Sequence, residues 1–143
     1  MSRPGSSAPR APASAPVIAI VNSNDDLVGL LRDELVRFGF SVVTAHIRDF
    51  KARLESFGTF LTTHNPHVIV YDISVPYEEN WASFQTICKL PEARSRHWVV
   101  TTVNKRVLEE RVGPTGAIEI QGGRADDLDP VLDAVQKVAR PSR

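Results

Sequence analysis

HVIVYDISVP, residues 67–76, is the stretch that decides the fold. Its short apolar run, VIVY, is rich in β-branched residues and is typical of a strand buried on both faces of a parallel sheet. The run ends at Asp72, and Pro76 turns the chain four residues later. Open parallel sheets bind ligands at the carboxyl ends of their strands, so Asp72 is placed for a functional role. A carboxylate in this position also satisfies turn amides or caps a helix, and the residue alone leaves both interpretations open.

The composition is that of a globular domain with a tail. Of 143 residues, 42% are hydrophobic and 24% are charged, and 17 Lys+Arg balance 17 Asp+Glu. A formal net charge of zero gives no electrostatic basis for binding nucleic acid or an anionic membrane surface. Cys88 is the single cysteine, which excludes an internal disulfide and favours a reducing cytoplasm. No apolar run reaches the ~18 residues of a membrane span, so we expect a cytoplasmic protein without nucleic-acid or membrane partners.

The two ends of the chain differ from its middle. Residues 1–16, MSRPGSSAPRAPASAP, are almost all Ala, Pro, Ser, Gly and Arg. Such a segment buries too little apolar surface to offset its ordering entropy, and we predict a disordered tail. Residues 140–143 are predicted to be a short frayed end. The span 17–139 contains no repeat and no linker, and we predict that it is the one folded domain.

Within that span, strand and helix patterns alternate. Continuous or β-branched apolar runs predict strands at residues 17–21, 40–45, 68–71, 97–103 and 117–120. Apolar residues at helical spacing predict helices at 27–38, 49–63, about 80–88, 104–112 and a last helix from 127 or 129 to 138. Ser23, Asn80 and Asn104 are the expected N-caps of three of these helices.

Five repeats of strand then helix define the fold class. Strict alternation implies an α/β fold with right-handed crossovers and helices on both faces of a parallel sheet. For five strands we predict the flavodoxin-like doubly wound (βα)5 arrangement, with strand order 2-1-3-4-5. The switch point of this order lies between the first and third strands. Asn22, Ser23 and Asp72 leave those strands and should meet there.

The span from Val17 to Ala139 resembles a bacterial response-regulator receiver domain. That family has an apolar strand ending in Asp, with Pro four residues later, and Asp72 and Pro76 fit this pattern. It also has a Thr or Ser at the end of the fourth strand, where this chain has Thr101, with Thr102 as the adjacent alternative. The resemblance implies that Asp72 accepts a phosphoryl group from a histidine kinase or phosphotransfer protein, and that Thr101 then hydrogen-bonds the phosphoryl oxygens.

The resemblance also implies a Mg²⁺ ion, held by Asp72, the backbone carbonyl of Ser74 and acids after the first strand. This chain has Asn22 and Ser23 at the acid positions. They offer neutral oxygens, whereas Mg²⁺ sites usually depend on one or two carboxylates. After the fifth strand, where the family has a Lys-Pro pair, Arg124 follows two glycines. Arg124 is a candidate replacement cation, and the alternative is a glycine turn with a solvated arginine.

Two functions follow, and neither is enzymatic. In the first, the chain is a stand-alone receiver of two-component or phosphorelay signalling, phosphorylated on Asp72. Its output then passes to a downstream protein partner, because no further domain follows the last helix, and the resemblance allows a homodimer through the last helices. In the second, it is a phosphorylation-independent pseudo-receiver that acts only as a protein-interaction module. The missing acids and lysine favour the second function, and the retained Asp72 and Thr101 favour the first.

A third candidate, a nucleotide or flavin binder of the same topology, is disfavoured by the loop after the first strand. A mononucleotide phosphate needs a loop of glycine, serine or threonine that presents backbone amides. Residues 22–26, NSNDD, contain no glycine and two acids that would repel phosphate.

Overall fold

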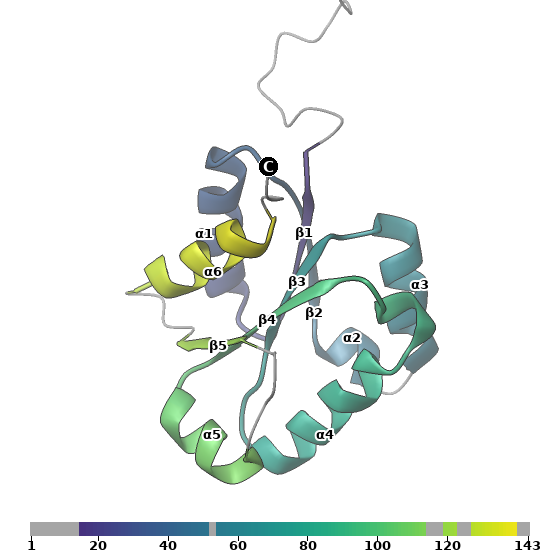
Figure 1. Ribbon diagram of the computed structural model, residues 1–143, viewed down its shortest axis with the longest axis vertical. Helices are drawn as coiled ribbons and strands as arrows, with labels where there is room; N and C mark the ends of the chain where they lie inside the picture. The colour runs from purple at the N-terminus through teal and green to yellow at the C-terminus, as the bar shows by residue number, and fades with distance from the viewer. Residues whose placement is uncertain (1–14, 52–53, 114–118, 123–126, 140–143) are drawn as a thin grey trace, which may run out of the picture.

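The computed structural model describes residues 15–51, 54–113, 119–122 and 127–139 (Figure 1). Its centre is a five-stranded sheet with the order β2-β1-β3-β4-β5, in which every neighbouring pair is parallel. The fold class and strand order predicted from the sequence are therefore confirmed. The strands are β1 (Val17–Asn22), β2 (Ser41–His46), β3 (Val68–Asp72), β4 (His97–Thr102) and β5 (Glu119–Gly122).

Helices cover both faces of the sheet. α1 and α6 lie on one face, and α3, α4 and α5 lie on the other (Figure 1). No helix in the described part of the chain is long and apolar enough to cross a membrane. The helices are α1 (Asp25–Arg37), α2 (Arg48–Lys51), α3 (Leu54–His64), α4 (Tyr77–Cys88), α5 (Lys105–Val112) and α6 (Asp129–Ala139), with a 3-10 turn, η1 (Pro91–Ala93), before β4.

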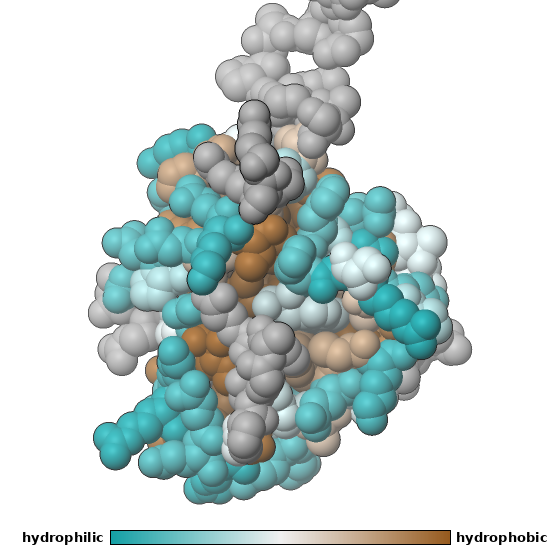
Figure 2. All heavy atoms as spheres, in the orientation of Figure 1, coloured by the Kyte–Doolittle hydropathy of each residue, from teal (hydrophilic) through white to brown (hydrophobic). Residues whose placement is uncertain are grey.

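Two hydrophobic cores, one on each face, explain the continuous apolar runs of the central strands. Successive strand residues point to opposite faces, so Val70 packs towards α1 and α6 while Tyr71 packs towards α3 and α4. The core on the side of α3, α4 and α5 contains a cluster of aromatic residues, in which Phe57, Phe84 and Trp98 surround Tyr71. Figure 2 shows the same division from outside: hydrophilic atoms cover most of the visible helices, and apolar atoms gather in the strip between them.

The helix starts differ in part from those expected. α1 is capped by Asn24, whose Oδ1 accepts a hydrogen bond from the Leu27 amide at 3.1 Å, and not by Ser23. Asn104 caps α5 as predicted, through the Val107 amide at 3.2 Å. Within the helix expected at 49–63, the structure describes α2 and α3, and residues 52–53 between them lie outside the described part of the chain.

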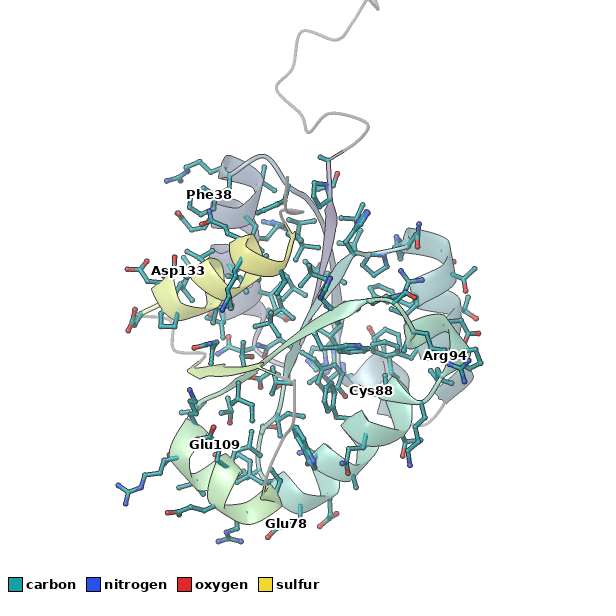
Figure 3. The ribbon with its side chains drawn as sticks, in the orientation of Figure 1. Phe38, Glu78, Cys88, Arg94, Glu109 and Asp133 are labelled. Carbon is teal, nitrogen blue, oxygen red and sulfur yellow. The ribbon has the colours of Figure 1, made fainter. Side chains whose placement is uncertain are left out.

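α4 begins at Tyr77, three residues before the expected start, and Asn80 lies inside it rather than capping it. The sequence predicts a start at Asn80 because the apolar spacing begins only at Trp81. Glu78 and Glu79 stabilise the earlier start, since acids in the first turn interact favourably with the helix dipole. Glu78 also pairs with Arg111 of α5 at 3.2 Å, and Figure 3 shows it at the end of α4 nearest α5.

The last strand is also placed differently. It was expected at residues 117–120, and β5 is described over Glu119–Gly122, paired with β4 from Val99 to Thr102. Residues 114–118 lie outside the described part of the chain, as do the predicted tail up to residue 14, the predicted frayed end and Arg124.

Candidate functional site

The carboxyl ends of three neighbouring strands place Asn22, Asp72 and Thr101 at one edge of the sheet. Asp72 is the last residue of β3 and pairs in register with Thr101 of β4. On the other side of β3, Val21 pairs with Tyr71, so the next residue of β1, Asn22, lies alongside Asp72. The strand order thus brings together side chains that are far apart in the sequence. This is the switch point at which the sequence predicted a site.

Asp72 is a buried carboxylate with one hydrogen bond. Its exposed fraction is 8%, and its Oδ1 accepts a hydrogen bond from the Thr101 hydroxyl at 2.9 Å. Burial raises the pKa of Asp72 to about 6, and the Thr101 hydrogen bond opposes this rise. The group is therefore largely ionised at neutral pH. Within the described residues its second oxygen, Oδ2, has no hydrogen-bond partner, which leaves one carboxylate oxygen able to act as a nucleophile.

The structure distinguishes the two adjacent threonines. Thr101 is 2% exposed and makes the contact with Asp72. Thr102 is fully buried, and its hydroxyl has no hydrogen-bond partner among the described residues. Of the two alternatives from the sequence, Thr101 is the one whose hydroxyl reaches the carboxylate.

Two of the oxygens expected to hold Mg²⁺ already accept hydrogen bonds. The Asn22 side chain is 5% exposed, and its Oδ1 accepts hydrogen bonds from the backbone amides of Ser23 at 2.6 Å and Asn24 at 2.9 Å. A carbonyl oxygen has two lone pairs, and both are used here. The backbone carbonyl of Ser74 accepts a hydrogen bond from the Asn80 side chain at 2.7 Å.

The described residues also supply few acidic ligands for a metal ion. Among the described residues no group of three or more His, Cys, Asp or Glu side chains is placed to hold a metal ion. Asp72 is then the single carboxylate of the expected ligand set; the Asn22 oxygen accepts two hydrogen bonds, the Ser74 carbonyl accepts one, and Ser23 contributes only a neutral hydroxyl. This donor set does not fit Mg²⁺, which prefers six oxygens including one or two carboxylates. Arg124, the candidate replacement cation, lies outside the described residues.

A cavity of about 540 Å³ opens beside Asp72, and the sequence analysis did not anticipate it. It runs from the ends of β1 and β3 to α4, and the segment after β2 forms its other wall with His46, Ile47 and Arg48. Tyr71 also lines it, and burial is the main cause that raises the pKa of Tyr71 to about 12. The signal available in the sequence was positional: residues 46–48 leave β2, the strand next to the switch point.

Comparison with solved structures shows which proteins share this architecture. A CheY-like response regulator receiver domain from Methylobacillus flagellatus superposes with a TM-score of 0.64 at 12% identity, covering 87% of this chain and 99% of that chain. A sensor protein from Polaromonas sp. JS666 gives 0.69 at 16% identity, covering 87% and 95%. The chemotaxis protein CheY4 of Vibrio cholerae gives 0.62 at 15% identity, covering 87% and 99%.

These matches cover 95–99% of each neighbour's chain. Because the sequence identities are only 12–16%, the matches show a shared fold and nothing more. The chain has the fold of CheY-like receiver domains, as the sequence resemblance predicted. No family model matches the sequence, and no curated protein matches it.

Proposed function

We propose that this chain is a receiver domain of two-component or phosphorelay signalling, which accepts a phosphoryl group on Asp72 and signals by protein contact in the cytoplasm. One observation carries the proposal. The buried carboxylate at the carboxyl end of β3 accepts a hydrogen bond from the hydroxyl at the end of β4, in a fold shared with receiver domains. A histidine kinase or a phosphotransfer protein is the proposed donor.

The chemistry follows from the two side chains. The free Oδ2 of Asp72 attacks the phosphorus of a phosphohistidine, the new O–P bond forms, and the P–N bond breaks with its electrons going to the imidazole. The product is an acyl phosphate on Asp72. The Thr101 hydroxyl, which now donates to the carboxylate, turns to donate to a phosphoryl oxygen. That exchange changes the end of β4, which leads directly into α5, and α5, β5 and α6 form the proposed output surface.

Intact-mass spectrometry after incubation with acetyl phosphate tests the proposal. Wild-type protein should gain the mass of one phosphoryl group, and Asp72→Asn should gain none. Parallel incubations with Mg²⁺ and with EDTA show whether the reaction needs the ion, for which the donor set is unsuited. If acetyl phosphate gives no adduct, a mixture of phosphorylated histidine kinases replaces it as donor. A folded wild-type protein that stays unmodified with both donors would contradict the proposal.

The second candidate is a pseudo-receiver that binds its partner without phosphate. The specific observation in its favour is that Asn22, beside Asp72, holds its own loop together through two backbone amides instead of offering a ligand oxygen. In that case Asp72→Asn and wild type should bind the downstream partner equally. A loss of partner binding that depends on dephosphorylation would exclude it.

A further inference from the structure

Asp72 is a buried charge without a counter-ion. Its single hydrogen bond in the described part of the chain comes from the neutral Thr101 hydroxyl, and no ion pair among the described residues includes it. Charges buried in proteins are as a rule paired, because an isolated ion loses far more solvation than one hydrogen bond restores. Among the described residues Asp72 has no ion-pair partner and its neighbours fit Mg²⁺ poorly, so a ligand in the cavity beside Asp72 is one source of a positive charge. Arg124 lies outside the described residues.

The cavity beside Asp72 has the size and lining of a small-molecule site. Its volume of about 540 Å³ falls within the roughly 300–1,000 Å³ of typical ligand pockets. Apolar side chains line part of it, notably Ile47, Phe50 and Ile87. A phosphoryl group alone would leave most of this space empty. The cavity therefore suits an organic ligand with an apolar body.

The polar groups of the lining indicate the charge of that ligand. Tyr71 is 6% exposed, and its hydroxyl has no hydrogen-bond partner among the described residues. Asp72 lines the same cavity and has a second carboxylate oxygen without a hydrogen-bond partner among the described residues, so these two mostly buried residues offer oxygens. The exposed part carries Glu79 and Arg48, of opposite sign, and His46. The Nδ1 of His46 accepts a hydrogen bond from the Arg48 amide at 3.1 Å, so this nitrogen carries no proton there.

We propose that the cavity binds a small organic amine, whose ammonium group pairs with Asp72 and whose apolar body packs against Ile47, Phe50 and Ile87. A ligand carboxylate at the same position would be repelled by the Asp72 carboxylate, whereas a phosphoryl donor meets that repulsion only until the O–P bond forms. The regulatory consequence rests on the proposed function: a bound ammonium covers the oxygen that attacks phosphorus. The amine then competes with phosphorylation, and the site reports the presence of a metabolite as well as of a kinase.

Three probes of nearly equal shape test the charge preference: benzylamine, benzyl alcohol and benzoate, at matched ionic strength. Amide chemical shifts of the ¹⁵N-labelled full chain report both affinity and position. Benzylamine should shift amides of Tyr71–Ser74 and Ser83–Ile87 and bind at least about tenfold more tightly than benzyl alcohol, as expected for a hydrogen bond to a charged group. Benzoate should bind most weakly. Tightest binding of benzoate, or no saturable binding of any probe, would overturn the proposal.

Two substitutions test separately the contribution of the Asp72 charge and the contribution of the cavity volume to binding. Asp72→Asn should remove the preference for benzylamine over benzyl alcohol while leaving the apolar contacts. Ser83→Phe should block the cavity and weaken both probes at least about tenfold. Gln85→Phe is the matched control, because both residues are exposed on α4 and only Ser83 lines the cavity. Equal weakening by Ser83→Phe and Gln85→Phe would place binding elsewhere and contradict the proposal.

A Mg²⁺ titration at the same ionic strength completes the test. Shifts at Asp72 that saturate with Mg²⁺ alone, and abolish benzylamine binding, would identify a metal as the counter-ion and overturn the proposal. The binding measurements use unphosphorylated protein, so they stand whether or not Asp72 accepts a phosphoryl group. Phosphorylation of a protein that binds no amine would refute this inference and leave the proposed function intact.

Discussion

Two effects of opposite sign act on the carboxyl group of Asp72. Burial raises its pKa, because the charged form loses hydration, and the hydrogen bond from Thr101 stabilises the charged form. Burial is the larger effect, so the pKa settles at about 6. The carboxylate is consequently more basic than an exposed aspartate and still ionised at neutral pH. Both properties suit a nucleophile.

Thr101 and Thr102 offer a matched pair for testing this balance. Thr101→Val removes the donor to a buried carboxylate, so the pKa of Asp72 should rise above 6 and the free energy of unfolding at pH 7.5 should fall by about 1–3 kcal/mol. Thr102→Val removes a buried hydroxyl that has no partner among the described residues, so stability should stay the same or increase by up to about 1 kcal/mol. Carbon-13 NMR titration of the Asp72 carboxyl and urea unfolding measure the two quantities.

Thr101→Ser serves as the rescue, since it keeps the hydroxyl and should keep the pKa near that of wild type. Equal losses of stability in Thr101→Val and Thr102→Val would show that the hydroxyl at 101 has no special role. The sequence singles out Asp72 and Thr101 because Asp72 ends one apolar strand and Thr101 lies one residue before the end of another, a feature that is visible in the residue pattern. It did not show that the Asn22 oxygen is engaged by two amides, because that depends on the conformation of residues 22–24.

At the scale of elements, Arg96 holds together the amino-terminal side of the sheet. Its Nε donates to the Glu92 carbonyl at 2.6 Å, and its Nη1 donates to Asn65 Oδ1 at 2.9 Å and to the Pro66 carbonyl at 2.7 Å. These acceptors belong to η1 and to the loop between α3 and β3. The guanidinium of Arg96 therefore links η1, which precedes β4, to the loop that precedes β3. Its planar arrangement of several N–H donors allows it to bond to both segments at once.

Arg96→Met should lower the free energy of unfolding by about 2 kcal/mol, because the loop carbonyls lose their donors while the aliphatic packing is largely retained. Arg94→Met, two residues away, is the control: Arg94 lies exposed at the surface (Figure 3), and its loss should change stability by less than about 0.5 kcal/mol. Urea unfolding of both variants at one pH gives the comparison. Equal effects would refute a specific role for Arg96, and Arg96→Lys should recover only part of the loss, because an ammonium cannot reproduce the fork.

The period of the hydrophobic pattern predicted which segments are helices and which are strands. It did not predict the residues at which they begin and end. The apolar spacing of α4 starts at Trp81, yet its first turn is polar and begins at Tyr77. The helical spacing of Phe50, Leu54, Phe57 and Leu61 predicted one helix, and residues 52–53, between α2 and α3, lie outside the described part of the chain. His46, Ile47 and Arg48, at the end of β2 and the start of α2, line the cavity. No motif in the sequence marks the cavity, because it arises from how two elements pack, and the only signal was the position of residues 46–48 next to the switch point.

For the whole molecule, the sheet topology was predictable because burial of both faces leaves a clear record in the strands. β3 is buried at all five positions, which only a central strand covered by helices on both sides can be. Alternation with helices then forces parallel pairing and right-handed crossovers. The same burial encloses Asp72, so the charge of this carboxylate lowers the stability of the whole domain.

The pH dependence of unfolding should show that cost. The pKa of Asp72 is raised from its ordinary value of 3.8 to about 6 in the folded chain. Below pH 4 the group is protonated in both states and costs nothing. Between these values the folded state keeps the proton that the unfolded state has lost, so the free energy of unfolding falls as the pH rises. Above pH 6 the full cost of about 3 kcal/mol is reached.

Asp72→Asn removes this contribution. Urea unfolding of both proteins from pH 4 to pH 8 should therefore show the variant gaining about 3 kcal/mol relative to wild type across that range. A constant difference would mean that the carboxylate has a counter-ion in solution, which the described residues do not supply. Adding benzylamine should then reduce the difference at pH 8 and leave it unchanged at pH 4, because only the ionised carboxylate pairs with an ammonium group.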